Sequence, residues 1–260
     1  MRVARVVVHA DVTSFRHPFF VTGSVTGHQP TFDMPPPSTV LGHCASALGE
    51  WPNEQLFYFG IQFVYRSRGR DLEHQHMTQR LSPKTTTRVT TMGGDVRATT
   101  EITIQPVLRE FLFDVTMTLY LPPDLGQAFR QPVYPVVLGR SQDLAEVISV
   151  EEVTLERRGR ARVEHTLLPF SVRPYLHFGS TVLLSRYITP PPERYASFER
   201  YIVLHDPVFY GEGADPNRAL LQMDGVAFDG LWVDPTVVDE EGFARGVWIH
   251  RVADEATTDA

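Results

Sequence analysis

The chain has 260 residues, 42% of them apolar, and a single cysteine, Cys44. One cysteine excludes an intramolecular disulfide and favours a reducing compartment. No apolar run approaches the roughly 18 residues that a membrane span requires, so we expect a cytoplasmic protein without a membrane partner. The formal net charge of −7 argues against a nucleic-acid partner until the distribution of the charges is considered.

The positive charge gathers in one stretch of the chain. Residues 66–109 carry eight basic and four acidic side chains, whereas residues 190–260 carry five basic and 14 acidic ones. The basic residues are 23 arginines and one lysine, Lys84, and the guanidinium fork of Arg pairs bidentately with phosphate. The first stretch therefore favours an anionic partner. The alternative explanation is a GC-rich genome, which encodes Arg frequently.

The first 155 residues predict alternating strands and helices. A continuous apolar run predicts a buried strand over residues 3–10, followed by a loop over residues 11–33. A helix is predicted between residues 38 and 49, because Ser38 is a good N-cap and Gly49 can end a helix in a left-handed conformation. Alternating apolar residues predict strands at 56–65 and 111–121, with Phe113 on the apolar face of the second strand and Tyr120 on its polar face. A short helix at 124–130 and strands at 134–138 and 144–155 are predicted to follow. This order is typical of a ferredoxin-like or RNA-recognition-type fold.

Residues 85–103 differ from the strands on either side, because they hold eight threonines around Gly93-Gly94. A Gly-Gly pair fits a two-residue hairpin turn, yet neither face is apolar enough to form a core, and an isolated hairpin is marginally stable. We therefore predict a basic arm that needs an anionic partner to become ordered. An ordinary solvated hairpin insertion is the alternative.

The second half predicts a smaller β-rich module with short strands at 161–170, 181–188, 201–204, 231–233 and 247–249. The predicted fold class is thus α+β: a ferredoxin-like (RRM-type) N-terminal domain with a protruding β-hairpin thumb, followed by this module. We place the domains at residues 1–160 and 161–260, with the thumb at about 67–105.

Motifs for catalysis are absent from the sequence. There is no phosphate-binding GxxxxGK[ST] loop and no G-x-S-x-G elbow. Cys44 lies among small apolar residues, which indicates a buried, inert thiol, and His74 and His76 lack further ligands at a metal-binding spacing. The odd-numbered aromatic residues of FYFGIQFVY (57–65) indicate core positions rather than a base-stacking strand. A metal-independent ribonuclease built from Tyr, Lys and His stays open, although no such set is marked.

Several motifs occur in a characteristic order: VARVVVHADVTSFRHPF, MPPPSTVLGHCASALGE, PVLREFLFDVTMTLYL and VLGRSQDL. Together they resemble the Cas-five family of CRISPR-associated proteins, most closely its subtype I-B version, over about the first 160 residues. The resemblance implies a subunit of a type I Cascade complex that caps the 5′ handle of the guide RNA. The implied partners are this RNA, the Cas-seven backbone subunit, the large subunit and, through the complex, target DNA.

The resemblance also implies where RNA binds. The Pro-rich loop and the start of the following helix would face the handle, where free backbone N–H groups suit a phosphate, and the thumb would cross the guide RNA. For the helix start, the alternative is a well-capped helix that packs on the sheet and binds no phosphate. For Arg140, the alternative is a surface ion pair. A Lys-His pair used for RNA processing in subtype I-C is missing, so we expect no catalytic residues. The spacing of His74 and His76 predicts no metal site, and we expect no cofactor. The predicted RNA-binding residues are Arg16, His17, Ser38, Thr39, Gly42, His43, Arg68, Arg70, His76, Arg80, Lys84, Thr86, Arg88, Gly139, Arg140 and Ser141.

Overall fold

The computed structural model describes residues 1–17, 27–80, 88–91, 94–97, 100–190, 192–211, 217 and 230–252, with residues 77–80, 88–91, 94–97 and 100–103 described by their backbone alone. The chain forms two compact units. The first, here called the body unit, comprises Met1–Phe15, Phe32–Arg68 and Leu112–Ala260. The second, the hairpin unit, comprises Arg16–Thr31 and Gly69–Phe111.

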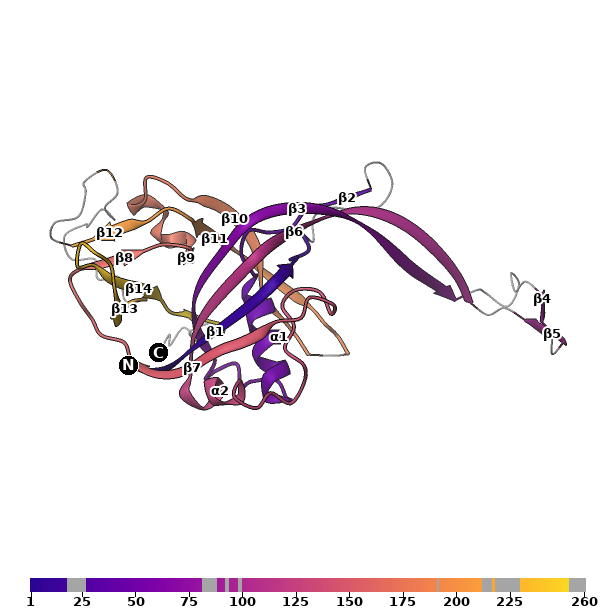
Figure 1. The fold of residues 1–260 in the computed structure, drawn as a ribbon, viewed down its shortest axis with the longest axis horizontal. Coiled ribbons are helices and arrows are strands. Elements are labelled where there is room, and N and C mark those ends of the chain that lie inside the picture. Colours follow the sequence, from indigo (N-terminus) through magenta and orange to yellow (C-terminus); the bar gives the residue numbers. More distant parts are fainter. Residues whose placement is uncertain are drawn as a thin grey trace, which may run out of the picture. The chain divides into compact units, whose positions relative to one another are not determined.

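Strands dominate the described part of the chain, with two α-helices and one 3-10 helix among them (Figure 1). The elements are β1 (Arg2–Thr13), β2 (His28–Gln29), α1 (Pro37–Leu48), β3 (Tyr58–Arg80), β4 (Arg88–Thr91), β5 (Gly94–Arg97), β6 (Thr100–Leu121), α2 (Pro123–Ala128), β7 (Glu146–Thr154), β8 (Ala161–Val163), β9 (Thr166–Pro169), η1 (Phe170–Tyr175), β10 (Ser180–Ile188), β11 (Ala196–Leu204), β12 (Val208–Tyr210), β13 (Leu231–Val238), β14 (Ala244–Trp248) and β15 (His250–Arg251). The fold is therefore mixed α and β with a large excess of β structure.

The largest sheet has the strand order β15-β3-β6-β1-β7, and β2 pairs in parallel with β6. Strand β1 lies antiparallel to both β6 and β7. In the body unit, side chains of β1, β3 and β6 pack with α1 and α2 in the main core, which includes Val6, Cys44, Phe59 and Met117. Tyr120 belongs instead to a second apolar cluster, with Val3 and Val247. Both faces of this sheet therefore carry buried side chains.

The proline-rich segment forms part of the core. Met34 is fully buried and Pro35, Pro36 and Pro37 are buried with it. Helix α1 begins at Pro37 with Pro36 as its cap, so the prediction of Ser38 as N-cap is wrong. Proline suits this first turn because it has no N–H to leave unpaired. Gly49 ends the helix at φ 86°, as predicted, and its N–H donates to Ala45 O.

The aromatic strand agrees with its alternating pattern, whereas the second alternating strand departs from it. Phe57, Phe59 and Phe63 are buried, which confirms their assignment to the core. In β6 the alternation changes at Asp114, whose φ is 55°. As a result Phe113 is 42% exposed, although it was assigned to the core face. Tyr120, assigned to the polar face, is buried by the second cluster.

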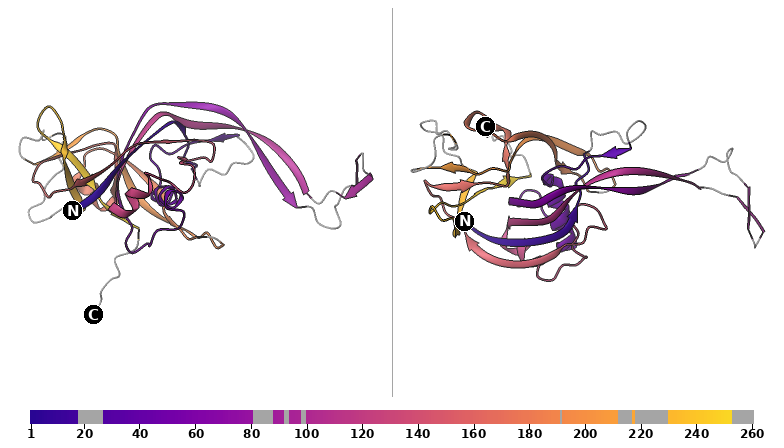
Figure 2. Two further views of the ribbon diagram at one scale, coloured as in Figure 1. Left: turned by 60° about the horizontal axis from the view of Figure 1, so that its bottom comes forward. Right: turned by 45° about the horizontal axis from the view of Figure 1, so that its top comes forward.

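The remaining strands of the body unit form two smaller sheets, β10-β11-β9 and β12-β8-β14-β13 (Figure 2). The predicted strand at 161–170 is divided into β8 and β9 by His165, which has a φ of 49°. The segment 134–138, predicted as a strand, contributes only an isolated bridge between Val137 and Leu144. None of the described helices has both the length and the apolar character needed to cross a membrane.

In the hairpin unit, β4 pairs antiparallel with β5, and Thr91 lies opposite Gly94. Gly94 is thus a strand residue, and the two residues between the strands are 92 and 93, which lie outside the described residues. The predicted turn at Gly93-Gly94 falls partly on residue 93, outside the described residues, and stays a prediction. The predicted thumb, about 67–105, overlaps this unit. The domain boundary predicted at residue 160 stays a prediction.

Candidate nucleic-acid interface

Strand β3 carries the exposed arginines that the charge distribution singled out. In the body unit Arg66 has a side chain 75% exposed, and Arg68 is 37% exposed. In the hairpin unit Arg70 is 60% exposed. Alternate residues of a strand point to the same face. Within the body unit, the guanidinium groups of Arg66 and Arg68, at alternate positions of one strand, offer the bidentate donors that phosphate accepts.

Asp33 is the centre of a polar cluster in the body unit, which we call the Asp33 cluster: Asp33, Tyr65, Arg68 and His205. The Tyr65 hydroxyl donates to Asp33 Oδ1 at 2.8 Å, and the Arg68 guanidinium forms an ion pair with the same oxygen. His205 Nε2 lies 3.9 Å from Asp33 Oδ2. The side chains of Asp33 and His205 are 37% and 38% exposed. The cluster thus combines a phenol, an imidazole and a guanidinium at the surface.

The local structure explains why these groups meet. Buried Phe32 and Met34 fix the backbone on both sides of Asp33. Tyr65 follows the buried aromatic run of β3, and its ring meets the ring of His205 edge-on at 6.2 Å. Burial, reinforced by the hydrogen bond to Asp33, raises the pKa of Tyr65. The phenol therefore stays protonated and donates a hydrogen bond to Asp33. Arg68 was predicted from the sequence, whereas Asp33, Tyr65 and His205 were not.

The start of α1 faces protein rather than an open surface. Ser38 Oγ lies 2.6 Å from Ser185 Oγ of β10. Ser38, Thr39 and Gly42 are all partly buried. His43 is buried, its Nδ1 lies 2.9 Å from Val137 O, and its ring packs against Phe129. Burial lowers the pKa of His43. This geometry favours the alternative of a packed helix at His43, while the role of the other three residues in RNA binding stays a prediction.

The turn at residues 139–141 packs against the end of β1. Gly139 has φ 90°, and a Cβ there would come within 2.6 Å of Thr13 Oγ1. Arg140 donates from Nε and from one terminal nitrogen to Asp143, at 2.9 and 2.8 Å. Its side chain is only 14% exposed. The geometry thus favours the ion-pair alternative for Arg140, whereas Ser141 is exposed.

In the hairpin unit, buried charges join β2 to β6. Glu110 is 5% exposed and accepts from Arg70 at 3.3 Å, and it lies 3.2 Å from His28 Nε2. Arg109 is 7% exposed and donates to Gln29 Oε1 at 3.3 Å. These contacts stabilise the parallel β2–β6 pairing. They leave most of the Arg70 side chain at the surface.

The other predicted residues of this unit are described to different extents. Arg16 is exposed and forms an isolated β-bridge with Thr31. His17 is partly buried, and this burial lowers the pKa of its imidazole. His76 is exposed on β3. Arg80 and Arg88 are described by their backbone alone, and Lys84 and Thr86 lie outside the described residues. Their contacts with RNA stay predictions.

Two other expectations concern reactive groups. Cys44 is fully buried, and burial raises the pKa of its thiol, which agrees with the predicted inert side chain. Among the described residues, no group of three or more His, Cys, Asp or Glu side chains has an arrangement that could hold a metal ion.

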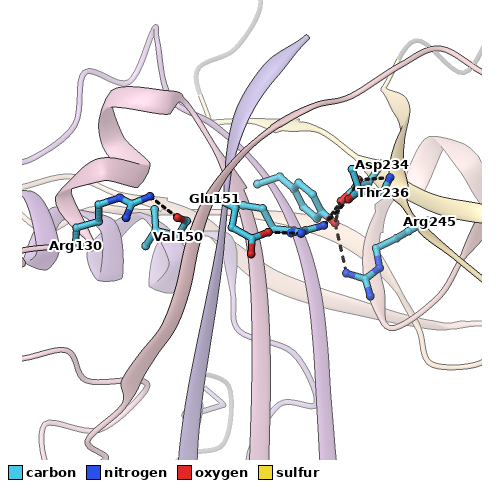
Figure 3. Close-up of polar contacts among 8 residues, drawn as sticks. Arg130, Val150, Glu151, Asp234, Thr236 and Arg245 are labelled. Atoms are coloured by element: carbon cyan, nitrogen blue, oxygen red, sulfur yellow. Dashed lines mark hydrogen bonds and ion pairs between the residues drawn. The ribbon is translucent and has the colours of Figure 1, made fainter.

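A second carboxylate-centred group, the Asp234 network, has a different character (Figure 3). It comprises Arg5, Tyr120, Glu151, Asp234, Thr236 and Arg245. Asp234 has a fully buried side chain. Its Oδ2 accepts from Arg5 and Tyr120, and its Oδ1 accepts from the Thr236 hydroxyl and N–H, at 2.6–3.0 Å. The network joins β1, β6, β7, β13 and β14, and leaves Asp234 no solvent contact.

Comparisons with known proteins support the family inferred from the motifs. A family model described as CRISPR-associated protein (Cas_Cas5) matches residues 5–182. No curated protein matches the chain.

Among solved structures, the chain is similar to one from a "CRISPR RNA-guided surveillance complex", with 15% identity, coverage of 84% of this chain and 95% of that chain, and a TM-score of 0.47. It is also similar to a chain of the type III-B Cmr-beta complex bound to cognate target RNA (10% identity, 79% and 86% coverage, TM-score 0.46). A third similar structure is a CRISPR protein from Archaeoglobus fulgidus, with 10% identity, coverage of 82% of this chain and 98% of that chain, and a TM-score of 0.39.

The family match says nothing of subtype, so the assignment to subtype I-B stays a prediction. The match extends beyond residue 160, where the motif resemblance ended, and covers more than half of the chain. The chain belongs to the family of CRISPR-associated proteins described as Cas_Cas5.

Proposed function

We propose that this protein is a non-catalytic RNA-binding subunit of a CRISPR effector complex of type I, where it binds the 5′ handle of the guide RNA. Its partners would be the Cas-seven backbone subunit, the large subunit and, through the complex, target DNA. Membership of the family supports the CRISPR context. The observation that carries RNA binding is the exposed series Arg66 and Arg68 on β3 of the body unit.

We further propose that the N-terminal part is a ferredoxin-like domain. What supports this is the chain order β1, α1, β3, β6, α2, β7, combined with the strand order β3-β6-β1-β7. In a ferredoxin-like sheet the first and third strands lie in the middle, which is where β1 and β6 lie here. The additional strands β2 and β15 would be elaborations of this domain.

Phosphate contacts should dominate the affinity for RNA, and such binding weakens steeply with salt. The test uses the purified chain and radiolabelled repeat RNA in a native gel, at several salt concentrations without metal. We expect the double variant Arg66→Glu/Arg68→Glu to bind at least about tenfold more weakly, because two phosphate contacts become repulsive, and to show a shallower salt dependence.

Arg2→Glu is the matched control, because the Arg2 side chain is 69% exposed on β1, away from this series in the sequence. It makes a surface ion pair with Glu152 at 3.1 Å, and such pairs contribute little to stability. It should leave RNA binding close to that of the wild type. Equal binding by the double variant and the wild type would contradict the proposal.

The Asp33 cluster favours one alternative, a repeat-specific, metal-independent endoribonuclease. His205 could accept a proton from a ribose 2′-hydroxyl, whose oxygen would attack the neighbouring phosphorus. The Tyr65 hydroxyl could protonate the departing 5′-oxygen. The products would be a 2′,3′-cyclic phosphate and a 5′-hydroxyl, with Arg68 stabilising the phosphate charge.

Denaturing gels of the same repeat RNA separate the two functions. The handle-binding proposal predicts intact RNA with the wild type and with Tyr65→Phe and His205→Ala. A specific cut by the wild type that both variants lose would instead establish the nuclease. Lys84→Ala completes the set, because Lys84 is the one lysine of the chain.

A further inference from the structure

The sheet β10-β11-β9 exposes an apolar face with one arginine, here called the Phe198 face: Phe170, Leu183, Phe198 and Arg200. The three apolar side chains are 38%, 41% and 40% exposed. Large apolar side chains exposed next to one another mark binding surfaces more often than scattered ones do. These residues lie outside the segments that carry the proposed handle contacts.

The strand register places these side chains together. Leu183 of β10 lies directly opposite Arg200 of β11. Pro169 of β9 lies opposite Tyr201, which brings the next residue, Phe170, beside Arg200. The Arg200 guanidinium lies 5.6 Å from the centre of the Phe170 ring. Phe198 is two positions from Arg200 on the same strand, so its side chain points to the same face.

The segment that builds this sheet has a small excess of positive charge, although the end of the chain is acidic. Residues 166–204 carry four arginines and two glutamates, whereas residues 206–260 carry three arginines and 12 acidic residues. Glu199 points to the other face, where it accepts from the Tyr201 hydroxyl at 3.0 Å. Among the described residues, no carboxylate lies within ion-pair distance of Arg200, whose recorded contact is the Phe170 ring.

We propose that the Phe198 face binds single-stranded nucleic acid, with bases stacked on Phe170 and Phe198 and a phosphate held by Arg200. Aromatic side chains exposed on a sheet stack bases without sequence preference, because every base has a flat π-face. An arginine between them supplies both a cation and a planar stacking surface. A docked acidic peptide is the competing occupant, but it would not require the aromatic character of both rings.

The experiment exploits that difference. A 12-nucleotide oligouridine and its deoxy counterpart, labelled with fluorescein, are titrated with the full chain and read by anisotropy. These probes lack a handle sequence, but phosphate contacts on β3 would bind them as well, so the Arg66→Glu/Arg68→Glu variant is titrated alongside to separate that contribution from the Phe198 face. We expect Phe170→Leu and Phe198→Leu each to weaken binding at least about fivefold, because stacking is lost while apolar area is largely kept. Phe198→Trp should bind as well as the wild type or better.

Arg200→Gln should lower the slope of log K against log salt by about 0.7, the value expected for one lost contact to a single strand. Ile148→Leu on β7 is the control, because Ile148 is 56% exposed in another sheet; its affinity should not change. The ratio of ribo- to deoxyoligonucleotide affinity then identifies the source of the strand. Equal affinity of the wild type and both leucine variants, or no binding of either probe, would overturn the proposal.

Discussion

Two carboxylates in this protein, Asp33 and Asp234, each accept hydrogen bonds from a tyrosine and an arginine, yet they differ completely in solvent contact. The Asp234 side chain is 0% exposed and the Asp33 side chain is 37% exposed. The comparison teaches that the identity of the groups does not decide their role. A buried charge must be fully paired to be tolerated, whereas an exposed one remains accessible to a ligand.

The hydrogen bonds of the two sites follow this rule. Arg5, Tyr120 and Thr236 satisfy both oxygens of Asp234. At Asp33, one oxygen accepts from Tyr65 and Arg68, and the other lies 3.9 Å from His205. The Asp234 network therefore belongs to the stability of the fold, and the Asp33 cluster to the candidate interface.

The largest expected difference is in stability. Asp234→Ala should lower the free energy of unfolding by about 3–5 kcal/mol, because it leaves the Arg5 guanidinium without its buried partner. Asp33→Ala should cost at most about 1 kcal/mol, as for an exposed ion pair. Urea unfolding followed by circular dichroism measures both variants. Similar losses in the two variants would mean that burial does not separate the roles of Asp33 and Asp234.

Much of the fold could be predicted from local patterns. The alternation of Phe57, Phe59 and Phe63 specifies a half-buried strand, and Gly49 specifies a left-handed helix end, so both are confirmed by the structure. The exchange of faces at Asp114 could not be predicted, because a non-glycine residue at φ 55° leaves no signature in the apolar pattern. Tyr120 was misassigned for a different reason, since part of its cover, Val3 and Val247, comes from residues more than 100 positions away.

The candidate site could be predicted only where charge is local in sequence. Arg68 and Arg70 belong to a visible basic stretch, and both are exposed on β3. Asp33 and His205 are 172 positions apart, and only the packing of the folded chain brings them together. Arg140 shows the reverse case, because its nearby partner Asp143 binds it within the same turn.

A matched pair of tyrosine variants sharpens the comparison at smaller scale. Tyr120→Phe should cost about 1–2 kcal/mol, because a buried hydroxyl that donates to Asp234 and accepts from Arg245 is removed. Tyr65→Phe should change stability by no more than about 0.5 kcal/mol. Thermal and urea unfolding of both variants provide the measurement. A loss at Tyr65 as large as that at Tyr120 would place the Asp33 cluster in the core instead.

Lowering the pH should separate the contribution that the charge of Asp234 makes to the free energy of unfolding from the contribution of its packing. Burial alone would raise its pKa, but the hydrogen bonds from Thr236, Tyr120 and Arg5 outweigh burial and lower the pKa below its ordinary value. The unfolded chain therefore binds a proton at Asp234 more readily than the folded one does. The stabilisation is present above the unfolded pKa, about 3.9, and is lost as the pH falls through the folded pKa.

Asp234→Asn tests this effect, because it removes the titration while keeping the shape of the side chain. The difference in unfolding free energy between wild type and variant should be constant from pH 7 to about 5 and then shrink toward pH 2. Urea titrations at each pH measure it, with Asp33→Asn as the exposed counterpart. A difference that stays the same down to pH 2 would mean that Asp234 stabilises the fold through neutral hydrogen bonds rather than through its charge, and the contrast with Asp33 would then rest on burial alone.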